Sequence, residues 1–258
     1  MRFLQIILIG LALCLAIPAR ADRLADADAL YGDLLSRFVR NGRVDYRGLK
    51  AARKDLDACR EAYAAISERE FEGWIVSTRL AYLSNVYNLT VLEIIADDYP
   101  VSRIQKAGGW FSGDPFEWPS VSLFGRSISL KILQENYIRR DYAWPLAYFA
   151  LCQGARGSPP LRSEPYTGAR YYEQAADQAT QFLRSPAHNR LDAERGKLYL
   201  SPLFHWYASD FRREAKSVEA FVRKVSPEEW GLRDSPRKLS VSYGKFDWRL
   251  NDAATSKK

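Results

Sequence analysis

The spacing of apolar residues predicts a chain built mainly from amphipathic helices. Apolar side chains recur at steps of three and four within residues 53–66 and again within 70–96, the longest such segment. This spacing places them on one face of a helix. Shorter segments with helical spacing lie at 28–38, 129–140 and 171–183, and in the stretches that begin at Pro202 and Ser217.

Strand-like patterns are fewer and shorter. Asn41-Gly42 favours a tight turn, and residues 121–129 predict a hairpin around Phe124-Gly125-Arg126. Single strands are predicted at 148–152, 196–200 and 241–251. Because the strands do not alternate with helices, the pattern favours an α+β fold over a doubly wound parallel sheet. We expect a mostly helical single domain with a small antiparallel sheet.

The first 21 residues have the pattern of a secretion signal. Arg2 is followed by an apolar run over residues 3–17 and by Ala19-Arg20-Ala21 at the cleavage positions. The run is too short to span a membrane comfortably. Leu13 precedes Cys14 where a lipoprotein signal needs Gly or Ala. We therefore expect a cleaved signal peptide, a periplasmic or secreted protein and no stable membrane anchor.

The remaining chain shows no linker and no internal repeat. Residues 22–251 are therefore expected to form one domain, followed by a disordered tail at 252–258. Loss of Arg2 and Arg20 with the signal lowers the formal charge from +7 to +5. Basic residues are interspersed with acids, and no basic face or module indicates a nucleic-acid partner.

Cysteines and histidines are sparse after the signal. Cys59 lies on the apolar face of a predicted helix and Cys152 in a distant strand, so a disulfide between them is not favoured. His188 is expected in a loop without a site role, and His205 within a helix. These four residues lack the spacing of a zinc site, and no other cofactor is indicated.

Residues 148–162 (YFALCQGARGSPPLR) combine an apolar run with a turn of small and polar residues. Pro159 and Pro160 close the turn. A buried segment that ends in such a loop is a common place for a ligand site or a nucleophile. Cys152 stands at this junction, which raises the question of whether it reacts.

Several short motifs in a fixed order resemble the family known as domain of unknown function 547 (DUF547), widespread in exported bacterial proteins. The matching segments are Gly42–Tyr46 and Leu49; Asn85, Tyr87 and Asn88; Tyr99-Pro100; Ser129-Leu130 and Arg139; Phe149–Leu151; Pro159 and Leu161; Tyr166-Thr167; Leu200-Ser201; Phe204, Trp206-Tyr207 and Asp210-Phe211; and Asp247-Trp248 with Leu250-Asn251. They span almost the whole chain after the signal.

The resemblance implies a fold related to papain-like or transglutaminase-like thiol enzymes. The family pattern carries a cysteine where this chain has Gln153, and histidines where it has Tyr148 and Glu135. Ser158 stands at a second position that the family fills with Cys or Ser. The differences therefore fall where a thiol mechanism would need its groups.

Chemistry argues against an active thiol. A thiol nucleophile needs an adjacent base or positive group, and the amide of Gln153 supplies neither. Tyr148, with an ordinary pKa of about 10, is a poor base near neutral pH. A shift of one residue along a strand reverses the direction of the side chain. We therefore expect Cys152 to point into the core if Gln153 faces the site.

Three hypotheses follow. The favoured one is a catalytically degenerate protein whose cleft binds a small peptide, a thiol-peptide or a cell-envelope glycan. The candidate cleft residues are Asn85, Glu135, Gln153, Ser158, His205 and Asp247. The rival is a thiol-dependent hydrolase or acyl transferase that uses Cys152 and His205. The third is a purely structural scaffold, in which Asn85 and Asn88 only pin neighbouring loops.

Overall fold

The computed structural model describes residues 22–109 and 113–256, and it confirms the predicted mostly helical α+β domain. The signal peptide predicted at 1–21 lies outside these residues. The helices are α1 (Arg23–Phe38), α2 (Tyr46–Ala51), α3 (Arg53–Ala64), α4 (Glu68–Glu72), α5 (Val76–Asp98), α6 (Leu130–Ile132), α7 (Tyr171–Leu183), α8 (Leu203–Trp206), α9 (Ala208–Ala215) and α10 (Val218–Val225). A π-helical segment, Leu133–Arg140, continues α6.

The strands form three small sheets. Two are antiparallel hairpins, β1 (Val39–Arg40) with β2 (Arg43–Val44) and β3 (Val121–Leu123) with β4 (Arg126–Ile128). The third has the order β5 (Arg190–Asp192), β6 (Lys197–Leu200) and β7 (Ser240–Tyr243). In that sheet β5 pairs with β6 antiparallel, whereas β6 and β7 run parallel.

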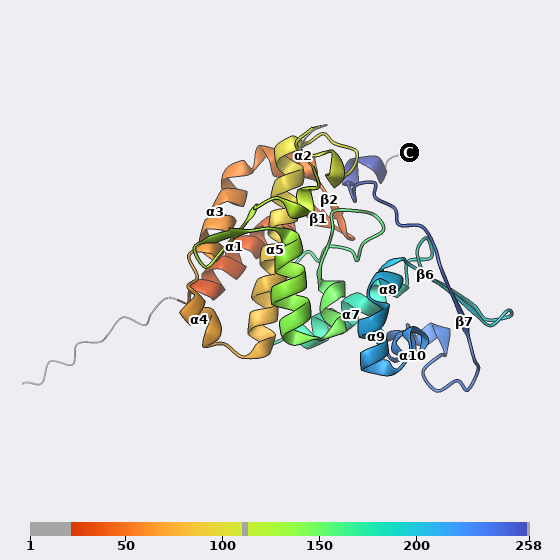
Figure 1. Cartoon of the computed structure of the whole chain (residues 1–258). Coiled ribbons are helices and arrows are strands. Elements are labelled where there is room, and N and C mark those ends of the chain that lie inside the picture. Colours follow the sequence, from red (N-terminus) through yellow and green to blue (C-terminus); the bar gives the residue numbers. More distant parts are fainter. Residues whose placement is uncertain (1–21, 110–112, 257–258) are drawn as a thin grey trace, which may run out of the picture.

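Helix α5 is the centre of the fold. It contacts α2, α3 and α7, and in Figure 1 it runs between α1 and α3 on one side and α7 to α10 on the other. From Leu80 to Ala96 every residue of α5 is buried. A helix surrounded on all sides buries its polar residues too, and these then need partners within the protein.

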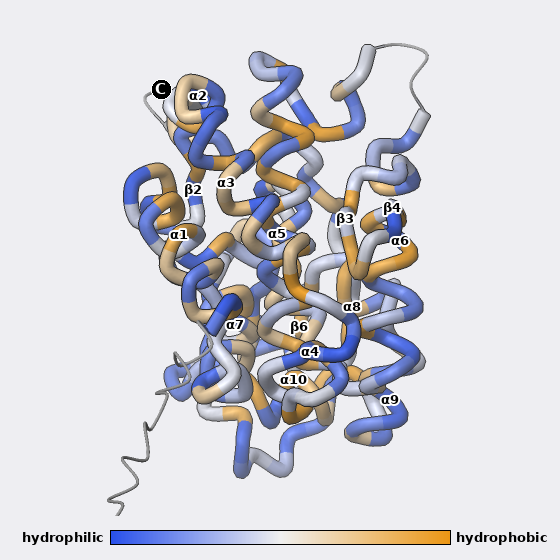
Figure 2. Tube along the Cα trace, turned by 90° about the vertical axis from the view of Figure 1, so that its left-hand side faces the viewer, coloured by the Kyte–Doolittle hydropathy of each residue, from blue (hydrophilic) through white to orange (hydrophobic). Residues whose placement is uncertain are grey.

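The apolar core has two parts. One gathers around α5 with α1, α2 and α3, and the other gathers around Phe149, Phe204 and Phe211 with α7 to α10. Hydrophilic residues occupy the outward turns of α9 in Figure 2. Tyr148 belongs to the second part and Cys152 to the first, so the segment between them joins the two. None of the described helices combines the length and the apolar character needed to cross a membrane.

The strand predicted at 148–152 is wrong. Pro145–Ala150 form a 3-10 helix, and Leu151 then becomes extended. Within the described chain no strand pairs with this segment. The amide of Asn88 takes the place of a strand partner: its Nδ2 donates to Ala150 O at 2.8 Å, and its Oδ1 accepts from Cys152 N at 2.8 Å. A side chain on α5 thus fixes the segment that a sheet was expected to hold.

Two other boundaries differ from the sequence patterns. The helix predicted over 70–96 is divided into α4 and α5 around Gly73. The strand predicted over 241–251 covers only Ser240–Tyr243. The folded chain also continues past residue 251, because Asp252 is buried, accepts the Tyr99 hydroxyl at 2.9 Å and precedes a 3-10 turn at Ala253–Ser256.

Candidate functional site

The site region is built on a pairing between two segments that are distant in sequence. Residues 154–157 run beside residues 247–251, and we call this pairing the seam. Arg156 N donates to Arg249 O at 2.8 Å, Gly157 N to Asp247 O at 2.9 Å, and Asn251 N to Gly154 O at 3.1 Å. Pockets lie on both sides: Trp248 lines one, and its neighbours Asp247 and Arg249 line the other.

The first pocket, which we call the Gln153 pocket, has a volume of about 200 Å³. It is lined by aromatic, amide and charged side chains: Tyr87, Asp114, Phe116, Lys131, Gln134, Glu135, Gln153, Tyr207 and Trp248. The sequence motifs therefore bring two predicted site residues, Glu135 and Gln153, to one place. Tyr87, Tyr207 and Trp248 were missed as site residues, although all three belong to the quoted motifs.

Two polar atoms on the wall of the Gln153 pocket have no hydrogen-bond partner within the described protein. They are the hydroxyl of Tyr87, a residue with 0% exposure, and Oε1 of Gln153. Leaving such a buried group unsatisfied costs on the order of 1–3 kcal/mol. Both atoms are buried, so each side chain must shift toward the pocket before a molecule there can bond to it.

Glu135 is held by a chain of charged and hydroxyl groups. Its Oε2 lies 2.7 Å from Arg139 Nη1, and Arg139 Nε lies 2.7 Å from Asp210 Oδ2. The Tyr148 hydroxyl donates to the same oxygen of Asp210 at 2.8 Å. Burial opposes ionisation of Asp210, but the bonds from Arg139 and Tyr148 hold its pKa below the ordinary value.

Tyr148 does not line the pocket. Its ring stacks on Tyr207 with 4.2 Å between centroids, and burial raises the pKa of its phenol well above 10. Burial also raises the pKa of Tyr207 to about 12. Both phenols are neutral near pH 7, so neither acts as a base there.

Cys152 points away from the Gln153 pocket, into the core. It is 4% exposed, with Sγ 3.7 Å from Ser158 Oγ and 3.6 Å from Asn251 Nδ2. Burial raises the pKa of the thiol, and hydrogen bonds from Gly154, Ser158 and Asn251 offset this only in part. The thiol is therefore protonated and enclosed. Cys152 and Cys59 are both free, as the sequence favoured.

Asn85 and His205 line neither the Gln153 pocket nor the pocket across the seam. Asn85 is 1% exposed and holds the backbone of Tyr166, donating to its carbonyl at 2.8 Å and accepting from its N–H at 2.9 Å. It therefore pins a loop. His205 is exposed on α8, with its ring 5.0 Å from that of Tyr243. Over residues 22–109 and 113–256, no three His, Cys, Asp or Glu side chains gather as a metal site.

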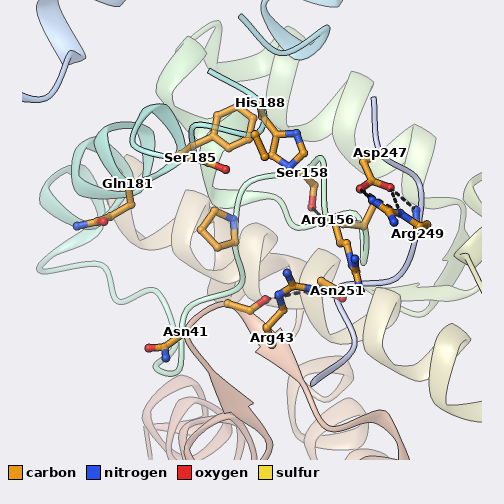
Figure 3. A pocket seen from close by; sticks show the side chains of 15 residues that line it. Asn41, Arg43, Arg156, Ser158, Gln181, Ser185, His188, Asp247, Arg249 and Asn251 are labelled. Atoms are coloured by element: carbon orange, nitrogen blue, oxygen red, sulfur yellow. Dashed lines mark hydrogen bonds and ion pairs between the residues drawn. The ribbon is translucent and has the colours of Figure 1, made fainter. Parts of the chain in front are cut away.

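The pocket across the seam, which we call the Arg43 pocket, is larger, at about 390 Å³. The other two predicted residues, Ser158 and Asp247, line this pocket. Figure 3 shows them with Arg43 from the β1–β2 hairpin and His188 from the loop after α7. Only the fold could place His188 here, because nothing in its local sequence separates it from an ordinary loop histidine.

A family model described as "Protein of unknown function, DUF547" matches residues 71–183. The matched region runs from α4 to the end of α7 and contains Tyr87, Glu135 and Gln153. No curated protein and no solved structure matches the chain.

Proposed function

Since the chain belongs to the DUF547 family, we propose that it is a catalytically degenerate member that binds a short peptide or glycan segment in the Gln153 pocket. A thiol-containing peptide is one form of such a ligand. We place this activity in the periplasm or outside the cell because residues 1–21 have the composition of a secretion signal.

One observation carries the proposal: Tyr87 and Gln153 line the same pocket, and each has a buried side-chain atom without a hydrogen-bond partner in the described protein. A phenol hydroxyl donates and accepts hydrogen bonds, and an amide oxygen accepts them. A peptide group or a sugar hydroxyl offers donors and acceptors of both kinds. Binding would satisfy two groups that the folded protein leaves without partners.

The rest of the pocket suits the same ligands. Phe116, Tyr207 and Trp248 provide aromatic surface for an apolar side chain or the face of a sugar ring. Asp114 and Glu135 add two acidic side chains to the lining, and Lys131 adds one basic side chain. Pockets that bind small ligands combine apolar walls with a few placed polar groups in this way.

The surroundings of the cysteine favour binding over catalysis. A thiol mechanism needs an accessible Cys152 and a nearby imidazole. Cys152 is 4% exposed, and neither of the chain's two histidines lines the Gln153 pocket. Gln153, at the position where the family pattern has cysteine, has no nucleophilic group. These features support the binding hypothesis over the thiol hydrolase that pairs Cys152 with His205.

The Tyr87→Phe substitution tests the proposal. A panel of short peptides, glutathione and N-acetylglucosamine oligomers would be screened by NMR or calorimetry, and hits compared between wild type and variant. We expect a five- to tenfold loss of affinity, because one neutral hydrogen bond contributes about 1 kcal/mol. The unliganded variant should be at least as stable as the wild type, because the lost hydroxyl has no partner there.

The matched control is Tyr82→Phe on the same helix. The Tyr82 hydroxyl donates to Tyr63 O at 3.2 Å, so its loss should lower stability by about 1 kcal/mol and leave the affinity unchanged. Failure of every compound to bind at millimolar concentration would count against the proposal. So would equal affinity of Tyr87→Phe and the wild type.

A further inference from the structure

The Arg43 pocket concentrates positive charge on the opposite side of the seam. Three guanidinium groups, those of Arg43, Arg156 and Arg249, line it against a single carboxylate among its lining residues, that of Asp247. Asp247 is committed to Arg249, with 2.6 Å between Oδ2 and Nη2. The one carboxylate among the lining residues is therefore already paired.

Arg43 is the residue that this arrangement leaves unsatisfied. Its backbone is fixed in β2, and Val44 N next to it donates to Asn251 O at 3.0 Å. Arg43 lines the pocket, and its Nη1 is buried and has no hydrogen-bond partner in the described protein. A buried guanidinium nitrogen without an acceptor is unusual, because charged groups that lose water are normally paired.

Nearby positive charges disfavour the charged form of Arg43, and a bound anion would offset them. Burial lowers the pKa of Arg43, and the positive charges of Arg156 and Arg249 lower it further. Asp247 and Asp252 act in the opposite direction; Asp247 is paired with Arg249, whereas Asp252 accepts from the neutral Tyr99 hydroxyl and keeps its charge. A negative ligand would relieve both the like-charge repulsion and the unmet hydrogen bond.

The shape of the pocket also allows a ligand to enter. At about 390 Å³ it accommodates more than a single ion. The neutral polar residues Asn41, Gln181 and Ser185 also line it, on the side away from Asp247 and Arg249 in Figure 3. These side chains offer hydrogen bonds to the part of a ligand that carries no charge.

We propose that the Arg43 pocket binds an oxyanion group, a phosphate or a carboxylate, through the guanidinium of Arg43. The planar fork of arginine suits bidentate contact with both groups. This site is separate from the Gln153 pocket, because the seam lies between them and they share no lining residue. Its existence does not depend on what the Gln153 pocket binds.

Calorimetric titration with inorganic phosphate and with acetate tests the proposal on the purified protein at low ionic strength. Tighter binding of phosphate would identify a phosphate-bearing ligand, and tighter binding of acetate a carboxylate. We expect Arg43→Gln to weaken the better anion at least tenfold. Arg195→Gln is the matched control, because Arg195 is a well-exposed arginine outside the pocket and should have no effect.

The Asp247→Asn substitution tests the same proposal in the opposite direction, because it should strengthen anion binding. Removing the carboxylate should strengthen anion binding several-fold, while the asparagine oxygen keeps an acceptor for Arg249 N, which lies 3.1 Å from Asp247 Oδ1. No binding of either anion at 10 mM would overturn the proposal. Unchanged affinity in Arg43→Gln, or weaker binding in a folded Asp247→Asn variant, would overturn it equally.

Discussion

At the scale of single residues, the contrast between Cys152 and Gln153 decides the character of the site. The two are adjacent, yet the thiol is enclosed by Ser158 and Asn251 while the amide lines a pocket. The sequence correctly predicted the burial of Cys152, but from the geometry of a strand that does not form. Asn88, which clamps the backbone on either side of Leu151, is the actual cause.

The buried carboxyl of Glu93 predicts how the stability of the protein changes with pH. It is 6% exposed on α5, and burial raises the pKa of its carboxyl from 4.5 to about 7 despite Arg60 at 3.2 Å. Because the folded state favours the protonated form, the stabilisation is full below pH 4.5 and is lost as the pH rises to about 7. The loss is about 3 kcal/mol over that window.

Chemical denaturation of the wild type and of Glu93→Gln between pH 4 and pH 8 measures this effect. The variant mimics the protonated carboxyl, so its free energy of unfolding should fall less than that of the wild type as the pH rises. Parallel curves for the two proteins would mean that Glu93 does not titrate in this range.

At the scale of elements, the seam determines how both pockets are formed. Gly157 lies so close to the partner segment that an added Cβ would stand 2.7 Å from Asp247 N. That contact is with backbone, which cannot move aside without breaking the bond from Gly157 N to Asp247 O. Gly157→Ala should therefore destabilise the protein by about 1–3 kcal/mol and weaken ligand binding in both pockets.

Thermal unfolding and the two binding assays check this expectation. Gly244→Ala is the control, because the nearest atom to its added Cβ is Leu200 O at 3.9 Å, an ordinary contact. It should leave stability and both affinities close to those of the wild type. A Gly157→Ala variant that behaves like Gly244→Ala would show that the seam tolerates separation.

Local sequence signals predicted where helices and turns form better than they predicted which distant segments pack together. Ser129 and Ser217 cap the helices that the pattern assigned to them, with side chains that accept from Ile132 N and Ala220 N. The predicted turn at Asn41-Gly42 connects β1 to β2. By contrast, the apolar run 148–152 is equally consistent with a strand and with a buried 3-10 segment. Its conformation depends on Asn88, which lies 62 residues before Ala150.

At the scale of the whole molecule, the six predicted site residues do not share one cleft. Glu135 and Gln153 line the Gln153 pocket, whereas Ser158 and Asp247 line the Arg43 pocket. Motif order along the chain indicated that these residues matter together, but not which side of the seam each one faces. That division depends on the pairing of residues 154–157 with 247–251, which carries no local signature in the sequence.

The relationship to papain-like enzymes, export from the cell and the choice of ligand stay predictions. The proposed binding function rests on one premise, that the Gln153 position rather than Cys152 faces the site. The structure supports this premise with the burial of the thiol and the unpartnered amide oxygen of Gln153.

Labelling with iodoacetamide tests that premise most directly. Two proteins would be compared, both carrying Cys59→Ala: one retains Cys152, and the other combines Cys152→Ala with Gln153→Cys. We expect the thiol introduced by Gln153→Cys to react in the native state at least a hundredfold faster than Cys152, which should react only on unfolding. Native labelling of Cys152 at a rate equal to or above that of the Gln153→Cys thiol would contradict the assignment of the site.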